Sequence, residues 1–364
     1  MTVTIVGAGI IGYAIAYELA ARGAEVRVID ARGSGLGATH ASAGMLAPYI
    51  EGHSAALLRL GVCSLEHYDS FVGRVAADAQ RSVEYRRSGT LQVARSDEEV
   101  RQLERDARRL AESGVSHTYL DGEGARRLEP ALAERIRAAL LVPLHGYVGV
   151  ATLMSALAKA AGAHGVTLVA ARVTGVDLRD GSVSVETPDE TFASDAGVIA
   201  AGSWSGAIPM APAGPPPVRP VRGQLLQLRF ASPPLSRVVW GAPGYLVPWE
   251  DGSVLVGATV EDAGFDESVT VEGVRQLLDG AVELLPAARF AAFDGARAGL
   301  RPATADELPI VGRSSTMPGV YYATGHYRNG VLLAPLTAAM IADLVLDGRE
   351  RGECSLVRPD RFGL

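Results

Sequence analysis

The sequence has few of the residues from which disulfide frameworks and zinc sites are built. Only two of its 364 residues are cysteines, and Cys63 and Cys354 lie far apart without forming a C-x-x-C pair. Small secreted proteins are rich in cysteine, and structural zinc sites need clustered cysteines and histidines. We therefore expect a cytoplasmic protein, in a reducing compartment, with neither disulfides nor a bound metal.

The sequence also lacks a long hydrophobic run and a basic segment. Its longest apolar stretch, residues 331–346, contains Pro335 and Asp343, and it is shorter than the roughly 20 residues that a membrane-spanning helix needs. The 34 Lys and Arg residues are outnumbered by 41 Asp and Glu residues, which gives a net charge of −7. This balance predicts a soluble protein that binds neither a membrane nor nucleic acid.

Several common catalytic signatures are absent. The sequence contains no H-E-x-x-H zinc motif, no cluster of cysteines and no serine-nucleophile elbow. These absences argue against zinc peptidases and serine hydrolases. The length of 364 residues suggests about two domains.

The first thirty residues have the pattern of a dinucleotide-binding unit. Residues 3–6 are a β-branched run that predicts a buried strand, and residues 13–21 have the apolar spacing of a helix. Between them Gly7, Gly9 and Gly12 stand in the spacing G-x-G-x-x-G. In such a unit the glycines allow a tight turn and a close backbone approach, and the helix N-terminus attracts phosphate groups. Because the unit begins at the N-terminus, we expect no signal peptide before it.

The residue at the end of the second strand indicates which dinucleotide is bound. The strand, residues 25–29, leads to Asp30, eighteen residues after Gly12. A carboxylate at this place accepts hydrogen bonds from a ribose 2′-hydroxyl and disfavours a 2′-phosphate. The sequence therefore predicts FAD or NAD and not NADP. The alternative is a plain βαβ core whose glycines serve ordinary turns.

Two later segments have the composition of loops that contact a cofactor. Residues 32–48 are rich in glycine, alanine and small polar residues, with the tightest part at 43–45, so their backbone can approach a ligand closely. A plain surface connection is the alternative. Residues 196–200 form a predicted strand that runs into a small-residue turn at Gly202, where a doubly wound sheet presents a second strand end to the cofactor. We expect a helix to begin at Ser203.

The rest of the chain alternates predicted helices and strands. A proline-rich run, residues 209–220, is typical of a crossover between domains. Strands are expected within 85–94, 140–150, 167–171, 173–177, 183–186, 225–230, 238–240, 244–249, 253–259, 310–312 and 320–324. Helices are expected at 54–77, 96–113, 124–130, 151–163, 271–285 and 331–346.

Six motifs together resemble one family. Besides the N-terminal glycines they are residues 43–48 (AGMLAP), 244–248 (GYLVP), 257–259 (GAT), 299–302 (GLRP) and 325–330 (GHYRNG). In this order they resemble glycine oxidase, which belongs to the D-amino-acid oxidase and sarcosine oxidase group of flavoproteins. The resemblance covers nearly the whole chain, and its last two motifs are specific for this family.

The resemblance implies a fold and a reaction. The fold is α/β (α+β overall), with a Rossmann-like FAD-binding domain interleaved with a substrate domain built on an antiparallel sheet. The expected ranges are 1–83, 147–218 and 298–364 for the FAD-binding domain, and 84–146 and 219–297 for the substrate domain. The implied reaction oxidises glycine to iminoglycine and reduces O2 to hydrogen peroxide. It often serves thiamine thiazole synthesis, and the enzyme is a homo-oligomer, either a tetramer or a dimer.

The resemblance also implies which residues bind FAD. They are Gly7, Gly9, Ile10, Ile11, Gly12, Asp30, Ala31, Ala38, Thr39, Ala43, Gly44, Met45, Val173, Gly202, His326, Tyr327, Arg328, Asn329, Gly330, Val331 and Leu332. Backbone N–H groups of residues 329–332, with the last helix behind them, would stabilise negative charge on reduced flavin. Of the seven histidines only His40 and His326 fall in these motifs, and we expect His326 to brace the cofactor loop and not to act as a base.

Three residues are expected to act on the substrate. By resemblance, Arg301 would bind the substrate carboxylate through its two-pronged guanidinium, Tyr245 would donate a second hydrogen bond to it, and Arg328 would lie near the substrate. The alternatives are that Arg301 forms a structural ion pair, that Tyr245 only packs within its sheet, and that Arg328 braces its loop. Glu51 is expected at the rim of the pocket.

The chain departs from the family pattern at three places, which leaves the substrate open. Trp249 stands where relatives usually carry a basic residue, residues 241–243 are unusually small, and Gly149 and Val150 replace an acidic residue and a proline. Such changes would reshape the pocket for an amine larger than glycine. The candidates are sarcosine, a D-amino acid and an N-carboxymethyl amino acid.

Three rival readings come from other classes. An NAD-dependent dehydrogenase would give no role to residues 43–45 or to the last glycine-containing loop. A flavoprotein dehydrogenase would use the same residues but pass its electrons to a quinone or a partner. A module in which flavin is catalytically inert would leave Arg301 and Tyr245 without a purpose.

Overall fold

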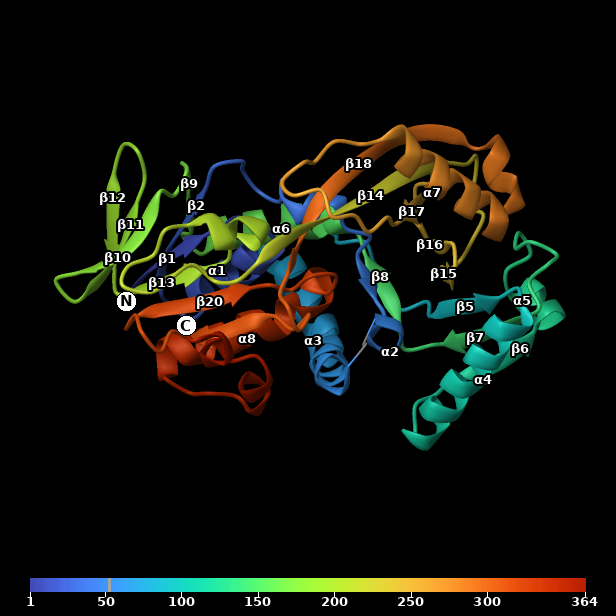
Figure 1. Cartoon of the computed structure of the whole chain (residues 1–364), viewed down its shortest axis with the longest axis horizontal. Coiled ribbons are helices and arrows are strands. Elements are labelled where there is room, and N and C mark those ends of the chain that lie inside the picture. Colours follow the sequence, from blue (N-terminus) through green and yellow to red (C-terminus); the bar gives the residue numbers. More distant parts are fainter. Residues whose placement is uncertain (52–53) are drawn as a thin grey trace.

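The computed structural model describes residues 1–51 and 54–364, and its two large sheets lie side by side along the long axis of the molecule (Figure 1). The first sheet has six strands in the order β19-β20-β13-β1-β2-β9. All neighbours are parallel except β19 and β20, which are antiparallel. The strands are β1 (Thr2–Val6), β2 (Glu25–Asp30), β9 (Thr167–Ala170), β13 (Ala196–Ile199), β19 (Ile310–Arg313) and β20 (Val320–Thr324).

The parallel sheet is covered on both faces, as its continuous apolar strands require. Four helices that pack against one another cover one face, and a small antiparallel sheet covers the other. The helices are α1 (Ile10–Ala21), α3 (Ala55–Ala79), α6 (Val150–Ala163) and α8 (Gly330–Asp347). The small sheet consists of β10 (Gly175–Arg179), β11 (Ser182–Glu186) and β12 (Thr191–Ser194).

The second large sheet has eight strands in the order β18-β14-β17-β16-β15-β5-β7-β6, almost all of them antiparallel. Its strands are β5 (Thr90–Ala94), β6 (Thr118–Asp121), β7 (Ala138–Val142), β14 (Arg219–Arg229), β15 (Val238–Gly241), β16 (Gly244–Pro248), β17 (Ser253–Gly257) and β18 (Ala292–Ala303). Three helices flank it, α4 (Asp97–Glu112), α5 (Gly122–Leu128) and α7 (Val271–Leu284).

Short elements connect and flank the two large sheets. The connecting sheet consists of β3 (Met45–Leu46), β8 (Gly146–Val148) and β4 (Tyr85–Arg86). The other short elements are α2 (Pro48–Glu51) and the 3₁₀ turns η1 (Ala38–Ala41), η2 (Gly202–Ala207), η3 (Pro286–Phe290), η4 (Gly352–Leu356) and η5 (Pro359–Phe362).

Helix α8 is long and apolar enough to cross a membrane, judged by length and composition alone. Its side chains from Val331 to Val345 are nevertheless buried within the molecule, against α1 and α3. Pro335 has no N–H to offer the carbonyl of Val331, and the hydroxyl of Tyr68 donates to that carbonyl instead, at 2.7 Å. The helix is therefore a core helix whose interior proline is compensated by α3.

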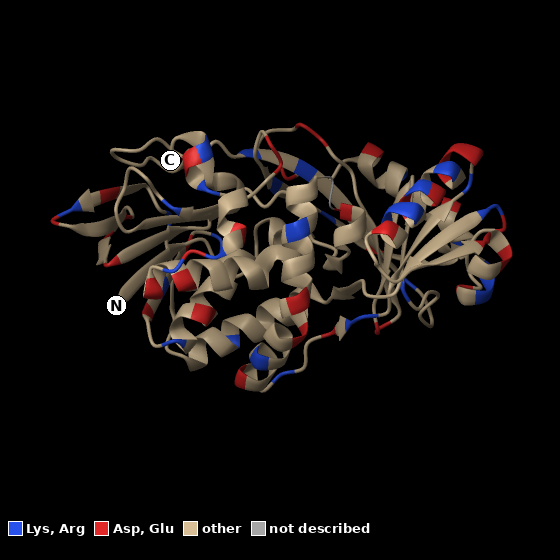
Figure 2. Ribbon diagram, turned by 90° about the horizontal axis from the view of Figure 1, so that it is seen from below, with Lys and Arg blue, Asp and Glu red and all other residues tan. Residues whose placement is uncertain are grey.

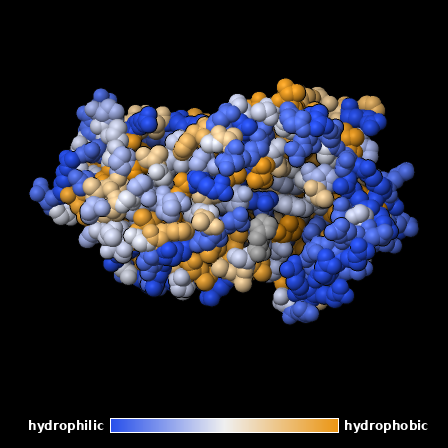
Figure 3. All heavy atoms as spheres, in the orientation of Figure 1, coloured by the Kyte–Doolittle hydropathy of each residue, from blue (hydrophilic) through white to orange (hydrophobic). Residues whose placement is uncertain are grey.

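The charged residues of both signs are interspersed along the chain (Figure 2). Helix α4 begins at the N-cap Ser96, whose hydroxyl accepts from the N–H of Glu99 at 3.2 Å. Only Leu103 and Leu110 of this helix are buried, and it forms a hydrophilic region at the lower right of Figure 3. The helix expected at 96–113 therefore exposes most of its surface to solvent.

The predicted fold class is confirmed as a mixed α/β structure, and the long helices begin and end within a few residues of their expected bounds. The helix expected from Ser203 is wrong, because this segment is the short 3₁₀ turn η2. Four strands were missed, the short β3 and the strands β6, β12 and β18. Alanine, glycine and charged residues dominate the first half of β18, so its extended form depends on pairing with β14 and not on intrinsic propensity. The domain ranges remain a prediction, and the boundary at 298 falls inside β18.

Asp343 connects α8 to α1 and to the C-terminal segment. Its carboxylate accepts from Arg22 at 2.7 Å, from Arg351 at 2.7 Å and from Arg349 at 2.9 Å. Burial alone would raise the pKa of Asp343, but the hydrogen bonds from these arginines outweigh it and lower the pKa from 3.8 to about 2. A lowered pKa stabilises the folded state above the unfolded-state value, and the stabilisation is lost as the pH falls through the folded-state value.

We predict that Asp343→Asn lowers the free energy of unfolding at pH 7 by about 2 kcal/mol. The difference from wild type should shrink as the pH falls from about 4 towards 2. Urea unfolding at several pH values measures it. Asp347→Asn, at an exposed acid on the same helix, serves as the control and should change stability little. A deficit of Asp343→Asn that stays constant down to pH 2 would contradict this role.

Candidate active site

One cavity of about 640 Å³ lies where the two large sheets meet. It begins at the carboxyl ends of the parallel strands β1, β2, β13 and β20 and extends to β16 and β18 of the antiparallel sheet. Ligands of open parallel sheets bind at this edge. The cavity is therefore the candidate active site.

The N-terminal glycines are required by close packing. Gly7 has φ +113°, and an added Cβ there would overlap the carbonyl group of Ala200 on the neighbouring strand connection. A Cβ on Gly12 would overlap the carbonyl oxygen of Gly7. Gly7 and Gly9 line the cavity, whereas Gly12 lies behind them and lets α1 approach the turn. The N-terminus of α1 thus faces the cavity, where the hydroxyl of Thr39 accepts from the N–H of Ile10 at 3.1 Å.

Asp30 lies at the edge of the same cavity. One of its carboxylate oxygens accepts from the N–H of Ala8 at 2.8 Å. The other accepts from the N–H groups of Arg32 at 2.7 Å and of Gly33 at 2.9 Å. Two carboxylate oxygens offer about four lone-pair sites, so the group remains able to accept from a ribose hydroxyl. Its backbone contacts fix its orientation.

The loop after β20 and the start of α8 form another wall. Val331 and Leu332 line the cavity in the first turn of α8, and their carbonyls are held by Tyr68 and Ser64 of α3 at 2.7 and 2.6 Å. No side chain of residues 1–51 and 54–364 caps this helix, so its first N–H groups and its positive dipole end are available to negative charge.

His326 in this loop is buried and forms a hydrogen bond through Nε2 with Thr337 Oγ1 of α8, at 3.0 Å. Burial lowers the pKa of His326 to about 3. The imidazole is therefore neutral at physiological pH and holds the loop to the helix, in the position that the bracing role requires.

Arg301 of β18 contributes a partly buried positive charge to the wall of the cavity. Its Nη1 donates to the carbonyls of Thr259 at 3.0 Å and of Arg222 at 3.3 Å. Within residues 1–51 and 54–364, neither Nη2 nor Nε has a protein acceptor, and the side chain forms no ion pair. Burial lowers the pKa of Arg301, Tyr245 opposes this effect and Arg328 adds to it. A guanidinium stays protonated in proteins, so this site is built for an anion.

Tyr245 of β16 lies beside this guanidinium, and its ring packs on Gly257, where a Cβ would overlap the phenol. Its other neighbour is Trp240, at a ring-centroid distance of 5.3 Å. Burial raises the pKa of Tyr245, and Arg301 partly opposes the rise. Its hydroxyl is therefore protonated and can donate to the same anion as Arg301.

Arg328 and Glu51 also line this part of the cavity. Arg328 Nε is 3.4 Å from Glu51 Oε2, with side chains that are 26% and 9% exposed. The acid partly compensates the charge of Arg328, in contrast to Arg301. Glu51 lines the cavity as expected.

The structure brings almost every residue expected from sequence to this cavity. Of the described residues, Gly12 and His40 do not line it, and His40 instead contacts the carbonyl of Gly37 at 2.6 Å. Trp249, Gly149 and Val150, three of the residues expected to reshape the pocket, do not line the cavity. Trp249 and Gly149 instead pack against each other, where a Cβ on Gly149 would lie 3.2 Å from the Trp249 ring.

The small residues 241–243 do line the cavity. Trp240, Val260 and Gln276 line it as well and were missed, because nothing in their local sequence distinguishes them from ordinary sheet and helix residues.

Comparisons with known proteins agree with this geometry. The profile of the family "FAD dependent oxidoreductase" matches residues 2–344. Glycine oxidase from Geobacillus kaustophilus (strain HTA426) is 34% identical over 349 residues, which cover 94% of this chain and 92% of that protein. The bifunctional protein ThiO/ThiG from Synechocystis sp. is 34% identical over 369 residues, 99% of this chain. The chain spans about half (54%) of the length of that bifunctional relative.

Solved structures give the same picture. The crystal structure of glycine oxidase from Geobacillus kaustophilus matches with a TM-score of 0.91 and 33% identity, over 96% of this chain and 95% of that one. The iminodiacetate oxidase from Chelativorans sp. BNC1 matches with a TM-score of 0.89 and 27% identity, over 98% of each chain.

We predict that Gly12→Ala abolishes tight cofactor binding, because the new methyl group would push α1 away from the turn at Gly7. Absorbance of bound flavin in the purified protein measures the effect. Gly162→Ala provides a matched control, since this glycine also lies in a helix but has no atom within 4 Å of its would-be Cβ. It should retain the cofactor and gain roughly 0.5–1 kcal/mol in stability. Normal flavin content in Gly12→Ala would contradict the packing argument.

Proposed function

This chain belongs to the family of FAD dependent oxidoreductases, and we propose that it oxidises glycine or another small amino acid at the bond between Cα and nitrogen. The single observation that supports this most directly is the partly buried guanidinium of Arg301, which has no acid partner among the described residues and lines the cavity. A charge that is partly withdrawn from water is stabilised by a counter-ion. The carboxylate of an amino acid is the counter-ion that we assign to it.

The residues around the cavity fit FAD. Glycines 7 and 9 keep the turn free of side chains, Asp30 offers an acceptor for a ribose hydroxyl, and the uncapped start of α8 supplies N–H groups. The chemistry that FAD supplies when bound is acceptance of a hydride from Cα and release of the electrons to O2, which yields hydrogen peroxide. Because the family is FAD-dependent, the NAD-dependent dehydrogenase is set aside.

The substrate-binding role belongs to the residues at the other end of the cavity. Arg301 donates from Nη2 and Nε, the Tyr245 hydroxyl donates a further hydrogen bond, and Arg328 adds positive charge. Two or three charge-assisted hydrogen bonds fix both oxygens of a carboxylate. With the carboxylate fixed, rotation of the substrate is restricted and Cα is held in one orientation, which is the main requirement for hydride transfer.

A second candidate substrate is an N-substituted glycine, such as sarcosine or an N-carboxymethyl amino acid. The observation that favours it is the cavity wall at Gly241, Ala242 and Pro243, which has only small side chains. A substituent on nitrogen has room on this side without displacing Arg301 or Tyr245. The similarity to an iminodiacetate oxidase points in the same direction.

The wider setting follows from the relatives. We propose a cytoplasmic homo-oligomer, a dimer or a tetramer, that contacts neither a membrane nor nucleic acid and that serves thiamine thiazole synthesis, as the names of the ThiO/ThiG relatives suggest. An enzyme that passes its electrons to a quinone or a partner is the alternative. The yield of peroxide per substrate oxidised in air distinguishes them, with a yield near one expected for an oxidase.

We predict that Arg301→Ala retains bound flavin but raises KM for the amino acid by roughly 100-fold or more, as expected for loss of about 3 kcal/mol from hydrogen bonds to a charged group. Steady-state peroxide formation and flavin absorbance measure the two properties.

Arg297→Ala is the matched control, since Arg297 lies on the same strand, is partly buried and does not line the cavity. It should leave KM within a few-fold of wild type. Oxidation of glycine by Arg301→Ala with an unchanged KM would refute the assignment of Arg301.

A further inference from the structure

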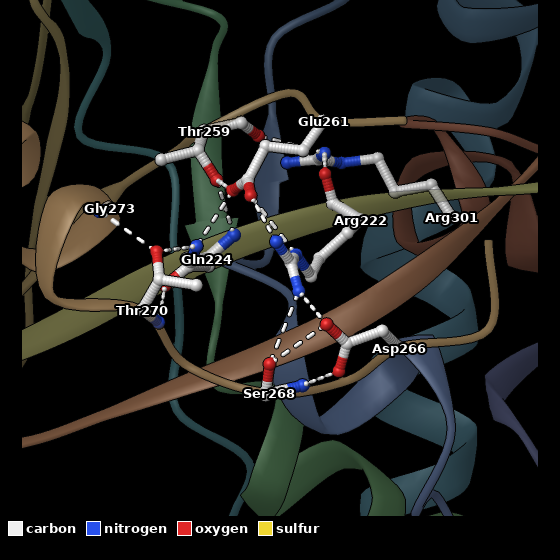
Figure 4. Close-up of polar contacts among 9 residues, drawn as sticks. All are labelled: Arg222, Gln224, Thr259, Glu261, Asp266, Ser268, Thr270, Gly273 and Arg301. Carbon is white, nitrogen blue, oxygen red and sulfur yellow. Dashed lines mark hydrogen bonds and ion pairs between the residues drawn. The ribbon is translucent and has the colours of Figure 1, made fainter. Parts of the chain in front are cut away.

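The guanidinium of Arg301 is held from behind by the backbone of two neighbouring segments (Figure 4). Its Nη1 donates to the carbonyls of Thr259 and Arg222, while Nη2 and Nε have no protein acceptor in the described chain, and the residue lines the cavity. The plane of the guanidinium lies on Gly223, where any Cβ would overlap Cζ, Nη1 and Nη2. The position of the Thr259 carbonyl therefore determines where the two free donors point.

Thr259 is itself fixed by its side chain. Its Oγ1 accepts from the N–H of Gln224 at 2.8 Å and donates to Oε1 of Glu261 in a short hydrogen bond. The backbone N–H of Thr259 donates to the carbonyl of Gln224 at 3.1 Å. Thr259 and Gln224 are 4% and 0% exposed, so water does not compete for these bonds. The segment after β17 is thereby held against β14.

Glu261 is the group on which these bonds converge. Its Oε1 accepts from Thr259 and from Gln224 Nε2 at 2.8 Å, and its Oε2 accepts from Arg222 at 2.6 and 3.0 Å. Burial alone would raise the pKa of Glu261, but the hydrogen bonds from Thr259, Arg222 and Gln224 lower it. Glu261 is therefore ionised, and its charge is satisfied by Arg222.

Arg222 has a second acid as well. Its Nη1 donates to Asp266 Oδ2 at 2.5 Å and to Ser268 Oγ at 3.3 Å. Two arginines and two acids thus lie close together, yet both acids pair with Arg222 and neither pairs with Arg301. This division leaves the charge of Arg301 available to a ligand.

We propose that Glu261 and Thr259 are positioning residues for Arg301. Glu261 accepts a hydrogen bond from the Thr259 hydroxyl and forms an ion pair with Arg222. The Thr259 carbonyl then holds Nη1 of Arg301, so that Nη2 and Nε of Arg301 are aligned to donate to a carboxylate. The inference rests on the proposed function, in which Arg301 binds the carboxylate of the substrate. It adds two residues that touch neither the substrate nor the cofactor.

The test is titration of the flavin-containing protein with acetate, followed by the change in flavin absorbance and by calorimetry. Acetate carries only the carboxylate, so its dissociation constant reports the alignment of the binding donors independently of turnover. Thr259→Val removes the hydroxyl at nearly constant shape and should weaken acetate binding roughly tenfold, as loss of one buried hydrogen bond implies. Thr259→Ser retains the hydroxyl and should bind acetate within about twofold of wild type.

Glu261→Gln gives an independent test, since it keeps the size of the side chain but loses the charge that pairs with Arg222. It should weaken acetate binding roughly tenfold or more and raise KM for the amino acid with a smaller change in kcat. Glu129→Gln is the matched control, because Glu129 also pairs with an arginine, Arg237, at 2.8 Å, but its hydrogen bonds go to Arg237 and Ser236 and not to Thr259 or Arg222. It should lower Tm without changing the acetate dissociation constant.

Arg301→Ala distinguishes the carboxylate-binding role of Arg301 from the positioning role of Thr259 and Glu261. If Arg301→Ala binds acetate as wild type does, the proposed function itself fails. If Arg301→Ala loses acetate while Thr259→Val and Glu261→Gln bind it with wild-type affinity, only the positioning role is overturned. If Glu129→Gln weakens acetate binding as much as Glu261→Gln, the effect is general destabilisation, and the positioning role is also overturned.

Discussion

A partly buried guanidinium that has no counter-ion among residues 1–51 and 54–364 is the constraint on which the rest of this site depends. Taking a charge out of water is costly unless it is paired, and the hydrogen bonds of Arg301 within this part of the chain go to two backbone carbonyls. The chain keeps it charged and unpaired by directing both nearby acids to Arg222. The long strands β14 and β18 make this possible, because their pairing places Arg222 opposite Leu300, next to Arg301.

The two large sheets contribute different chemistry to one cavity. The parallel sheet supplies strand ends, a glycine turn and the uncapped start of α8, which suit the phosphates and the ring of a dinucleotide. The antiparallel sheet supplies side chains on rigid strands, Tyr245 and Arg301, which suit a small anion. Because the cavity lies where the sheets meet, substrate and cofactor are brought together by the packing of two otherwise separate layers.

The parts of the site that were predicted from sequence are local in the chain or carried by motifs. The turn at Gly7, the acid at Asp30 and the loop at 325–330 each combine a backbone requirement with residues that are close in sequence. Trp240, Val260 and Gln276 could not be found in this way, because only long-range packing places them at the cavity. The expectation for Trp249 failed for the same reason, since its contact with Gly149 joins residues one hundred positions apart. The extent of β18 was missed because pairing with β14, and not composition, determines it.

The most direct measurement of the central claim is anaerobic reduction of the purified yellow protein by a panel of amines that differ in their carboxylate. Glycine, sarcosine, D-alanine and N-carboxymethyl-β-alanine carry one, and methylamine does not. We predict that at least one of the four amines with a carboxylate bleaches the flavin rapidly, and that methylamine at the same concentration does not. Bleaching by glycine alone would identify the small amino acid, and bleaching by sarcosine or N-carboxymethyl-β-alanine alone would identify the N-substituted glycine. Equal bleaching by methylamine, or no bleaching by any carboxylate, would contradict a site built around Arg301.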